Sequence, residues 1–141
     1  MEIKNQIKLL FHGVDFPIIN FESQNPLLTL EKKLNISIIP KVYFPKESPN
    51  SFSILQEINL QSENFFHLFV VAVGSFEIIE EVEEITKKNF VSINAPAIMF
   101  PYIRAFISTL TSNLGKVTGT ITIPTQFFNG ALEEIKELLP K

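Results

Sequence analysis

Several residue types are scarce in this 141-residue chain, and each scarcity narrows its chemistry. There is no cysteine, which excludes disulfides, thiolate catalysis and cysteine-ligated zinc. Arg104 is the single arginine and the formal net charge is −3, so the chain lacks the clustered positive charge that nucleic-acid binding requires. The five glycines are scattered, which leaves no loop that could cradle a phosphate. We therefore expect no cofactor and no nucleic-acid partner.

Long apolar runs are also missing. No uninterrupted stretch approaches the roughly 20 apolar residues that span a bilayer. The first residues, M-E-I-K-N-Q-I-K, lack the basic and apolar regions of a signal peptide. These features predict a cytoplasmic protein without membrane insertion.

What the chain does contain is apolar surface. Hydrophobic residues make up 45% of it, including 14 phenylalanines, while charged residues make up 19%, below the usual share of about 25%. The length fits one domain, residues 1–141. A domain of this size cannot easily bury so much apolar surface by itself. We expect it to associate with itself, to expose apolar patches to a partner, or both.

The residue pattern of the first half of the chain predicts β-strands. Apolar and polar residues alternate over 34–44 and again over 52–60, which predicts two strands with one buried face each. The nearly continuous apolar run 66–73 predicts a strand buried on both faces, and Gly74 a bulge or bend after it. Residues 7–21 predict one long, interrupted strand.

A proline and a polar turn add detail to these strands. Pro40 indicates an edge position or a bulge, because proline cannot donate a ladder hydrogen bond. The segment P-K-E-S-P-N-S at 45–51 predicts a turn from its proline, asparagine and serine content.

The second half predicts two helices. Apolar residues recur at spacings of three and four from Phe100 to Leu114, with Asn94 as a candidate N-cap and Gly115 as a stop. An extended link over 116–122 would lead to a C-terminal helix capped by Thr125. The predicted fold class is α+β, a four-stranded antiparallel sheet followed by a long helix and a C-terminal helix.

The start of the long helix has an unusual composition. The segment N-A-P-A-I-M-F-P-Y-I-R at 94–104 keeps two prolines, Pro96 and Pro101, where a helix interior normally excludes them. It resembles the Pro-x-Ile-Leu-Phe-Pro-Tyr-x-Arg signature of the protein-export chaperone SecB family. Weaker similarities in the same order are I-N-F-E at 19–22, E-N at 63–64 and I-P-T-Q-F at 123–127.

The resemblance implies a homotetramer, a dimer of dimers, that holds unfolded preproteins without ATP in apolar grooves. It also implies the SecA motor as a partner that docks on an acidic sheet face. Candidate groove residues are Leu34, Ile36, Ile38, Tyr102 and Phe127. Each of these residues could instead belong to the ordinary hydrophobic core or to a subunit interface.

The docking face departs from the family pattern. Glu22 matches one acidic position, but Ile18 replaces its neighbour and an apolar residue near Val70 replaces the acid of the fourth strand. Since complementary charge drives such encounters, the SecA interaction should be weak. A dedicated chaperone for one client, such as an antitoxin, is the alternative function.

Other polar residues have simpler interpretations. Arg104 could bind a client's carboxylate or backbone, or it could make an ion pair between subunits or cap a loop. His12 and His67 have no acids at metal-ligand spacing, so no metal site is predicted. The acids between Glu77 and Glu84 fit a solvated surface or a relocated dock for a basic partner.

A catalytic function finds little support. The hydroxyl residues Ser108, Thr109, Thr111 and Ser112 lack a histidine–acid pair. The long helix from 94 to 115 carries no acid of the kind that a hot-dog-fold thioesterase or dehydratase needs. The chain is therefore not expected to be an enzyme.

Overall fold

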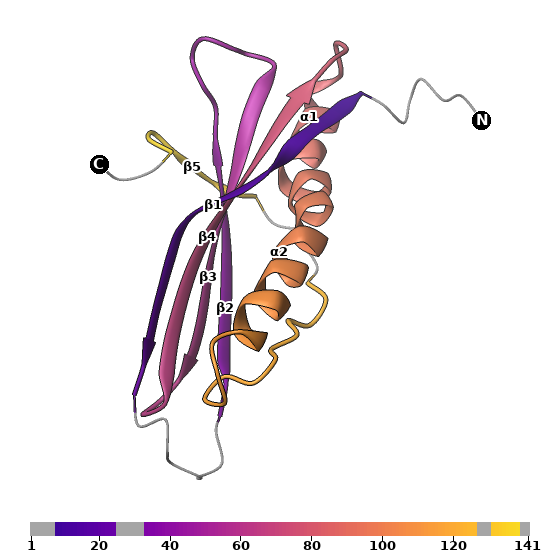
Figure 1. Ribbon diagram of the computed structural model, residues 1–141. Coiled ribbons are helices and arrows are strands. Elements are labelled where there is room, and N and C mark those ends of the chain that lie inside the picture. Colours follow the sequence, from indigo (N-terminus) through magenta and orange to yellow (C-terminus); the bar gives the residue numbers. More distant parts are fainter. Residues whose placement is uncertain (1–7, 25–32, 127–130, 139–141) are drawn as a thin grey trace, which may run out of the picture.

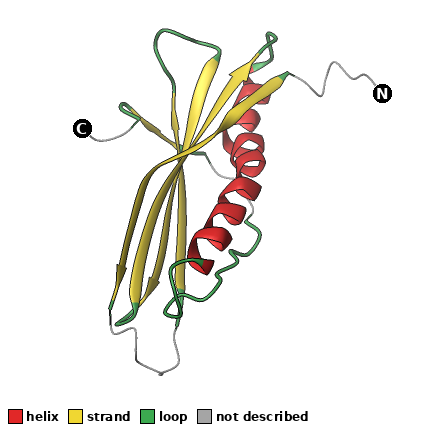
Figure 2. Cartoon of the chain, viewed as in Figure 1, coloured by secondary structure: helices red, strands yellow, loops and turns green. Residues whose placement is uncertain are grey.

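The computed structural model of the chain describes residues 8–24, 33–126 and 131–138. Four long strands come first: β1 (Leu9–Ser23), β2 (Asn35–Tyr43), β3 (Ser51–Ser62) and β4 (Phe66–Ile78). A helical stretch follows as α1 (Glu84–Asn89), the π-helical turn η2 (Phe90–Asn94) and α2 (Ala95–Ser112). A short strand, β5 (Glu133–Ile135), comes last. Figure 1 shows one twisted sheet with the helix along one of its faces, and Figure 2 shows the long loop that follows the helix.

The sheet has the order β1-β4-β3-β2-β5. The four long strands pair antiparallel, and β5 adds to the edge of β2 in parallel. This confirms the α+β class and the antiparallel sheet, with a fifth strand that the sequence pattern did not predict. Pro40 lies on β2 at a position without a described strand on its outer side, as an edge proline requires.

The core lies between the sheet and α2. It takes alternate residues of β3 and β4 and one stripe of the helix. Its fully buried members include Ile54, Ile58, Leu60, Leu68, Val70, Met99, Ile103 and Ile107. A smaller cluster of Leu55, Val71 and Val73 lies on the opposite sheet face. The middle of β4 is therefore buried on both faces, as its continuous apolar run predicted.

Gly74 does not form a bulge. It pairs regularly with Ile54 and Val14, and the register shifts belong to β1, which is interrupted as predicted. A Cβ at residue 74 would lie 2.9 Å from Sδ of Met99. Glycine is needed here because the helix crosses β4 closely, which the sequence alone could not distinguish from a bulge.

The helix begins ten residues earlier than Asn94. Asn94 has helical angles (φ −70°, ψ −48°) and makes no side-chain cap, so its prediction as N-cap is wrong. The helical run starts at Glu84 and widens at η2, where the Ala95 N–H donates to the Phe90 carbonyl. A wider turn relieves the clash that the Pro96 ring would make with the preceding turn. Gly115 does follow the helix end, with φ 113°.

The predicted C-terminal helix is wrong for residues 131–138, which form β5 and a series of bends. The apolar residues of this segment pack on two sides of the sheet edge. Leu132 contacts the main core, whereas Ile135 and Leu138 contact the smaller cluster. A helix with one apolar stripe could not reach both sides, while an extended chain over the edge of β2 can. Thr125 lies in the irregular segment before it.

The helical run Glu84–Ser112 is long and apolar enough to cross a membrane by length and composition. Core helices of soluble proteins share this composition. Here one side of the helix is buried against the sheet, with Ala95, Met99, Ile103 and Ile107 fully covered. Packing against the sheet accounts for the apolar residues on this side of the helix.

Candidate binding surface

The outer side of the helix is unusually apolar. Opposite its buried stripe, α2 exposes Ala97, Ile98, Pro101, Tyr102 and Ala105. Ile98 is 38% exposed and Tyr102 52% exposed. Charge is nearly absent from this side, since Arg104 is the only charged residue of α2. An apolar surface of this kind indicates a partner.

Aromatic rings connect this helix to the edge strand β1. Phe16 stacks on Phe106 with ring centroids 4.0 Å apart, and Phe11 contacts Tyr102 at 5.2 Å. Phe11 also contacts Phe76 of β4. Aromatic contacts of this geometry hold rings in place, so Tyr102 presents its exposed face from a fixed position.

The predicted groove residues lie in two separate places. Ile36 and Ile38 are half-buried on the helix-facing side of β2, and Leu34 is exposed just before that strand. Tyr102 lies beside β1, at the other end of the strand order. Phe127 lies outside the described residues. One chain therefore does not bring the β2 residues and Tyr102 into a single groove.

A hollow of about 450 Å³ lies beside α2, and the sequence did not indicate it. Its walls come from the helix and from the irregular segment after it, with Arg104 between them. The segment is fixed along the helix because the Ile121 N–H donates to Thr111 Oγ1 (2.9 Å) and Ser108 Oγ donates to the Ile121 carbonyl (3.1 Å). The buried Ile121 and Ile123, which alternate with threonines, are the signal that could have predicted this packing.

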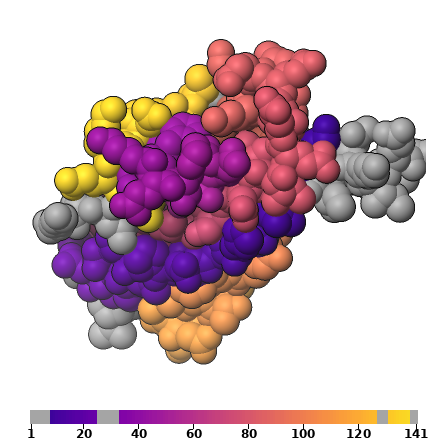
Figure 3. Space-filling model, turned by 90° about the horizontal axis from the view of Figure 1, so that it is seen from above, coloured from indigo at the N-terminus to yellow at the C-terminus, as the bar shows by residue number. Residues whose placement is uncertain are grey.

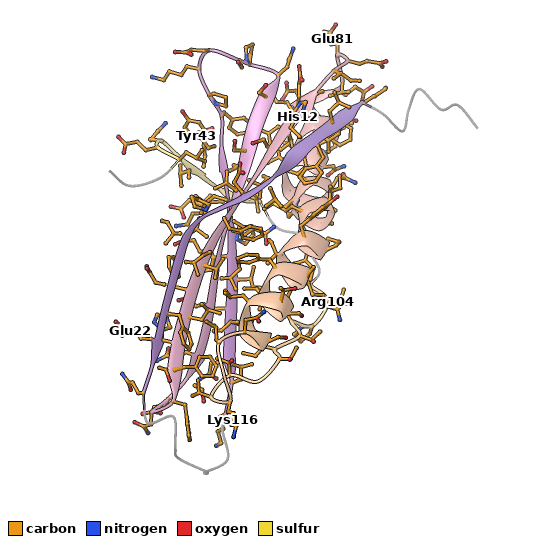
Figure 4. The ribbon with its side chains drawn as sticks, viewed as in Figure 1. His12, Glu22, Tyr43, Glu81, Arg104 and Lys116 are labelled. Carbon is orange, nitrogen blue, oxygen red and sulfur yellow. The ribbon has the colours of Figure 1, made fainter. Side chains whose placement is uncertain are left out.

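Two features make this hollow suited to an extended chain. Pro101 has no N–H, so the Ala97 carbonyl at its wall lacks the usual helical donor. Arg104 is exposed and makes no ion pair with a carboxylate of the described residues. The hollow thus offers an acceptor and a cation among apolar groups, and Figure 4 shows the cation, Arg104, on α2.

The opposite face of the sheet carries the predicted docking residue. Glu22 is exposed at the end of β1, where it pairs in register with His67 (Figure 4). Val70 does not belong to this face, because it is fully buried in the main core beneath the helix. Phe69 and Val71, with Ile18 beside them, are the apolar residues that face outward there.

A lysine lies at the border of this outer face. Lys41 Nζ is 2.6 Å from Oε1 of Glu57 across the β2–β3 pair. The hydrogen bond to Glu57 raises the pKa of Lys41 above its ordinary value, while burial opposes the shift and the charges of Glu57 and Glu133 add to it. Elsewhere, His12 Nε2 lies 3.1 Å from Glu77, and the acids that follow Glu77 are exposed in the β4–α1 loop.

The described residues contain no group of three histidine or acidic side chains that could hold a metal ion. The side chains around the hollow beside α2 include no acid–base pair. What this surface can do chemically is bind apolar and backbone groups.

Comparison with known proteins agrees with this architecture. The family model "Preprotein translocase subunit SecB" matches residues 18–118. An uncharacterized protein of Methanocaldococcus jannaschii is 34% identical over 113 residues, which cover 74% of this chain and 71% of that protein. The protein-export protein SecB of Orientia tsutsugamushi (strain Boryong) is 30% identical over 110 residues, which cover 69% of this chain and 65% of that protein.

A solved structure shows the same fold. It is the SecB-like chaperone of Mycobacterium tuberculosis in complex with a peptide from the HigA1 antitoxin. It superposes with a TM-score of 0.66 at 13% identity and covers 86% of this chain and 94% of its own. The strand order, the long helix, the signature at 94–104 and the family match over 18–118 lead to one assignment: this chain belongs to the SecB family.

Proposed function

We propose that this protein is an ATP-independent holding chaperone of the cytoplasm that binds exposed apolar segments of unfolded polypeptides. The observation that carries the proposal is the exposed apolar and aromatic surface along α2, on a chain of the SecB family. A holding chaperone must accept many sequences, so it needs apolar contacts and backbone partners rather than specific polar readers. The surface beside α2 has this chemistry.

The assembled form is proposed to be a dimer of dimers. Ile98 and Tyr102 project from the outer side of α2, and a second copy could bury Ile98 while Tyr102 stays open to a client. Assembly would also place the β2 residues Ile36 and Ile38 of one chain near Tyr102 of another. The groove predicted from Leu34, Ile36, Ile38, Tyr102 and Phe127 would then be shared between copies.

Apolar burial supplies the binding energy in this proposal. Each Å² of apolar surface removed from water contributes roughly 25 cal/mol, from which the ordering of the client must be subtracted. Release requires no nucleotide, because a client that folds or passes to another partner withdraws its apolar segments.

An aggregation assay tests the proposal. A slow-folding, chemically denatured protein is diluted into buffer without nucleotide, with and without the chaperone at one tetramer per client. We expect suppression of light scattering at this ratio and binding of the denatured client but not of its folded form. Equal binding of folded and denatured client, or no suppression by a sample that circular dichroism shows to be folded, would refute it.

A dedicated chaperone for one partner is the second candidate. The observation that favours it is the outer sheet face, where Ile18, Phe69 and Val71 are apolar and Glu22 is the expected docking acid that remains. A SecB-like chaperone of the same fold was solved in complex with an antitoxin peptide, which supports this candidate. We expect weak or undetectable binding of SecA in a pull-down, with no further loss in Glu22→Gln. Tight, Glu22-dependent binding of SecA would restore the export role.

A further inference from the structure

The C-terminal segment 131–138 lies across one edge of the sheet. Its strand β5 pairs in parallel with Lys41, Val42 and Tyr43 at the edge of β2. Figure 3 shows this segment, in yellow, as a cluster against the β2–β3 region and on the side away from the end of α2. The segment therefore occupies backbone groups of β2 that an edge strand otherwise offers to another chain.

The segment is held by few interactions. Three residues pair with β2, and parallel pairing is slightly less stable than antiparallel pairing. Leu132, Ile135 and Leu138 are half-buried, while Glu133, Glu134, Lys136 and Glu137 are exposed. The four long strands, in contrast, pair along nine or more residues each. Such a short edge strand can leave without disturbing the sheet.

An apolar surface lies under the segment. Ile135 and Leu138 pack against the outer-face cluster of Leu55, Val71 and Val73, together with Ile18 and Phe69. The segment 131–138 does not fill the space on either side of the β2 edge. Leu138, Ile18 and Phe69 line a hollow of about 270 Å³ together with the charged residues Lys41, Glu57 and Glu137. Another hollow, of about 460 Å³, lies between Leu132 and the start of the helix. Larger apolar side chains than those of the segment would fill these spaces better.

The charge of Lys41 favours an acidic residue at the position that pairs with it. Lys41 lies in register with Glu133 and makes an ion pair with Glu57, and the charge of Glu133 adds to the rise in the pKa of Lys41. An incoming strand with an acid at this register would keep the interaction, whereas a basic residue would meet Lys41 directly. The surface thus combines a strand edge that β5 can vacate, an apolar patch and a lysine paired with Glu57.

We propose that the edge of β2 and the outer-face patch form a binding surface for an extended peptide with an acid followed by large apolar or aromatic residues, and that the chain's own segment 131–138 covers this surface until such a peptide displaces it. Binding would occur by strand addition, in which backbone hydrogen bonds supply affinity and alternate side chains supply selectivity.

This inference deepens the proposed chaperone function and rests on it for the nature of the client. It also makes a separate quantitative claim. A covered surface binds with an affinity reduced by the fraction of molecules in which it is open. If about one molecule in ten to one hundred is open, removing the cover tightens peptide binding by about 10- to 100-fold.

An engineered disulfide that holds segment 131–138 on β2 tests the proposal directly. It can be introduced without interference because the chain has no cysteine of its own. The full-length double variant Tyr43→Cys with Ile135→Cys places two cysteines at paired positions of β2 and β5, which suits a disulfide. The probe is a fluorescent peptide copying residues 131–138 with Phe in place of Ile135 and Leu138. By anisotropy, we expect the reduced protein to bind it at least about tenfold more tightly than the oxidised protein.

An opened variant gives the complementary measurement. Ile135→Asp with Leu138→Asp in the full-length chain removes the apolar anchors of the cover and should bind the probe at least about tenfold more tightly than the original chain. Lys136→Asp is the matched control, because it makes the same change in net charge at an exposed position and should leave binding unchanged. A second probe with Lys in place of Glu133 should bind the opened variant more weakly.

The outcomes separate the two proposals. Equal affinity in the oxidised, reduced and opened forms overturns the covered surface, whether or not the protein suppresses aggregation. Tighter binding by the reduced and opened forms supports it, even if aggregation assays refute a holding chaperone. A disulfide that links two copies instead of one chain, seen on a non-reducing gel, also overturns it, since the occupant would then come from a second molecule.

Discussion

Two isoleucines of one helix allow a direct test of which side of α2 is core and which side meets a partner. Ile107 is fully buried against the sheet, and Ile98 is 38% exposed on the opposite side. Ile107→Ala removes three carbons from a packed site, which loses about 2.4 kcal/mol of transfer free energy at about 0.8 kcal/mol per group. The cavity that remains raises the loss to about 4 kcal/mol in the free energy of unfolding.

Ile98→Ala makes the same chemical change on the outer side. In a single chain it should reduce the free energy of unfolding by less than about 1 kcal/mol, since the side chain is partly in water and alanine is the better helix former. In an assembly that buries Ile98, it should instead weaken association. Its effect should therefore grow as the protein is diluted, while that of Ile107→Ala should not.

The assay is urea unfolding followed by circular dichroism at two protein concentrations about a hundredfold apart. Light scattering after gel filtration reports the size of the assembly for each variant. A loss in Ile98→Ala as large as that in Ile107→Ala and independent of concentration would refute the assignment of the two sides. An unchanged assembly in Ile98→Ala would refute its place at an interface.

Three further predictions concern single positions in the sheet. Gln56 is fully buried, and its Nε2 donates to the Pro96 carbonyl at 3.3 Å. Its Oε1 has no hydrogen-bond partner among the described residues. Gln56→Leu should therefore raise the free energy of unfolding, measured by urea denaturation, by about 1 kcal/mol. Gly74→Val should lower it by about 1–3 kcal/mol because the helix is too close, and a double-mutant cycle with Met99→Ala should recover part of this loss. Since the pKa of Lys41 is raised, its contribution is complete below its unfolded pKa of 10.5 and disappears as the pH rises through the higher folded value. Urea midpoints from pH 8 to 11.5 should therefore fall more steeply in the original chain than in Lys41→Met, with Glu57→Gln as the matched partner change.

The strands and the long helix could be predicted because they depend on local periodicity. Alternation over 34–44 and 52–60 and the apolar run after Phe66 gave three strands near their observed bounds. The start of the helix could not be predicted in the same way. Pro96 and Pro101 indicate a helix beginning, yet the helix reaches back to Glu84 through a π-helical turn that relieves the proline clash.

The candidate site was predicted only in outline. Apolar composition and the proline signature indicated the family and an apolar binding surface, and the exposed side of α2 agrees with both. The sequence could not show that Ile36 lies on β2 whereas Tyr102 lies beside β1, with β3 and β4 between the two strands. For the hollow around Arg104, the alternation of Ile121 and Ile123 with threonines indicated only an extended segment, and its position along α2 depends on tertiary packing.

By itself, the sequence determined the fold class, the family and the absence of cysteine chemistry, since these depend on residue types, spacing and local pattern. Tertiary structure decided which secondary structure an apolar pattern adopts and which part of the sheet it packs against. The spacing of Leu132, Ile135 and Leu138 fits a helix, but the open edge of β2 offers backbone partners and apolar surface on two sides, so the segment extends instead. The unpaired backbone groups of an edge strand can pair with any segment that lies next to them. Which segment lies there depends on contacts between residues far apart in the sequence.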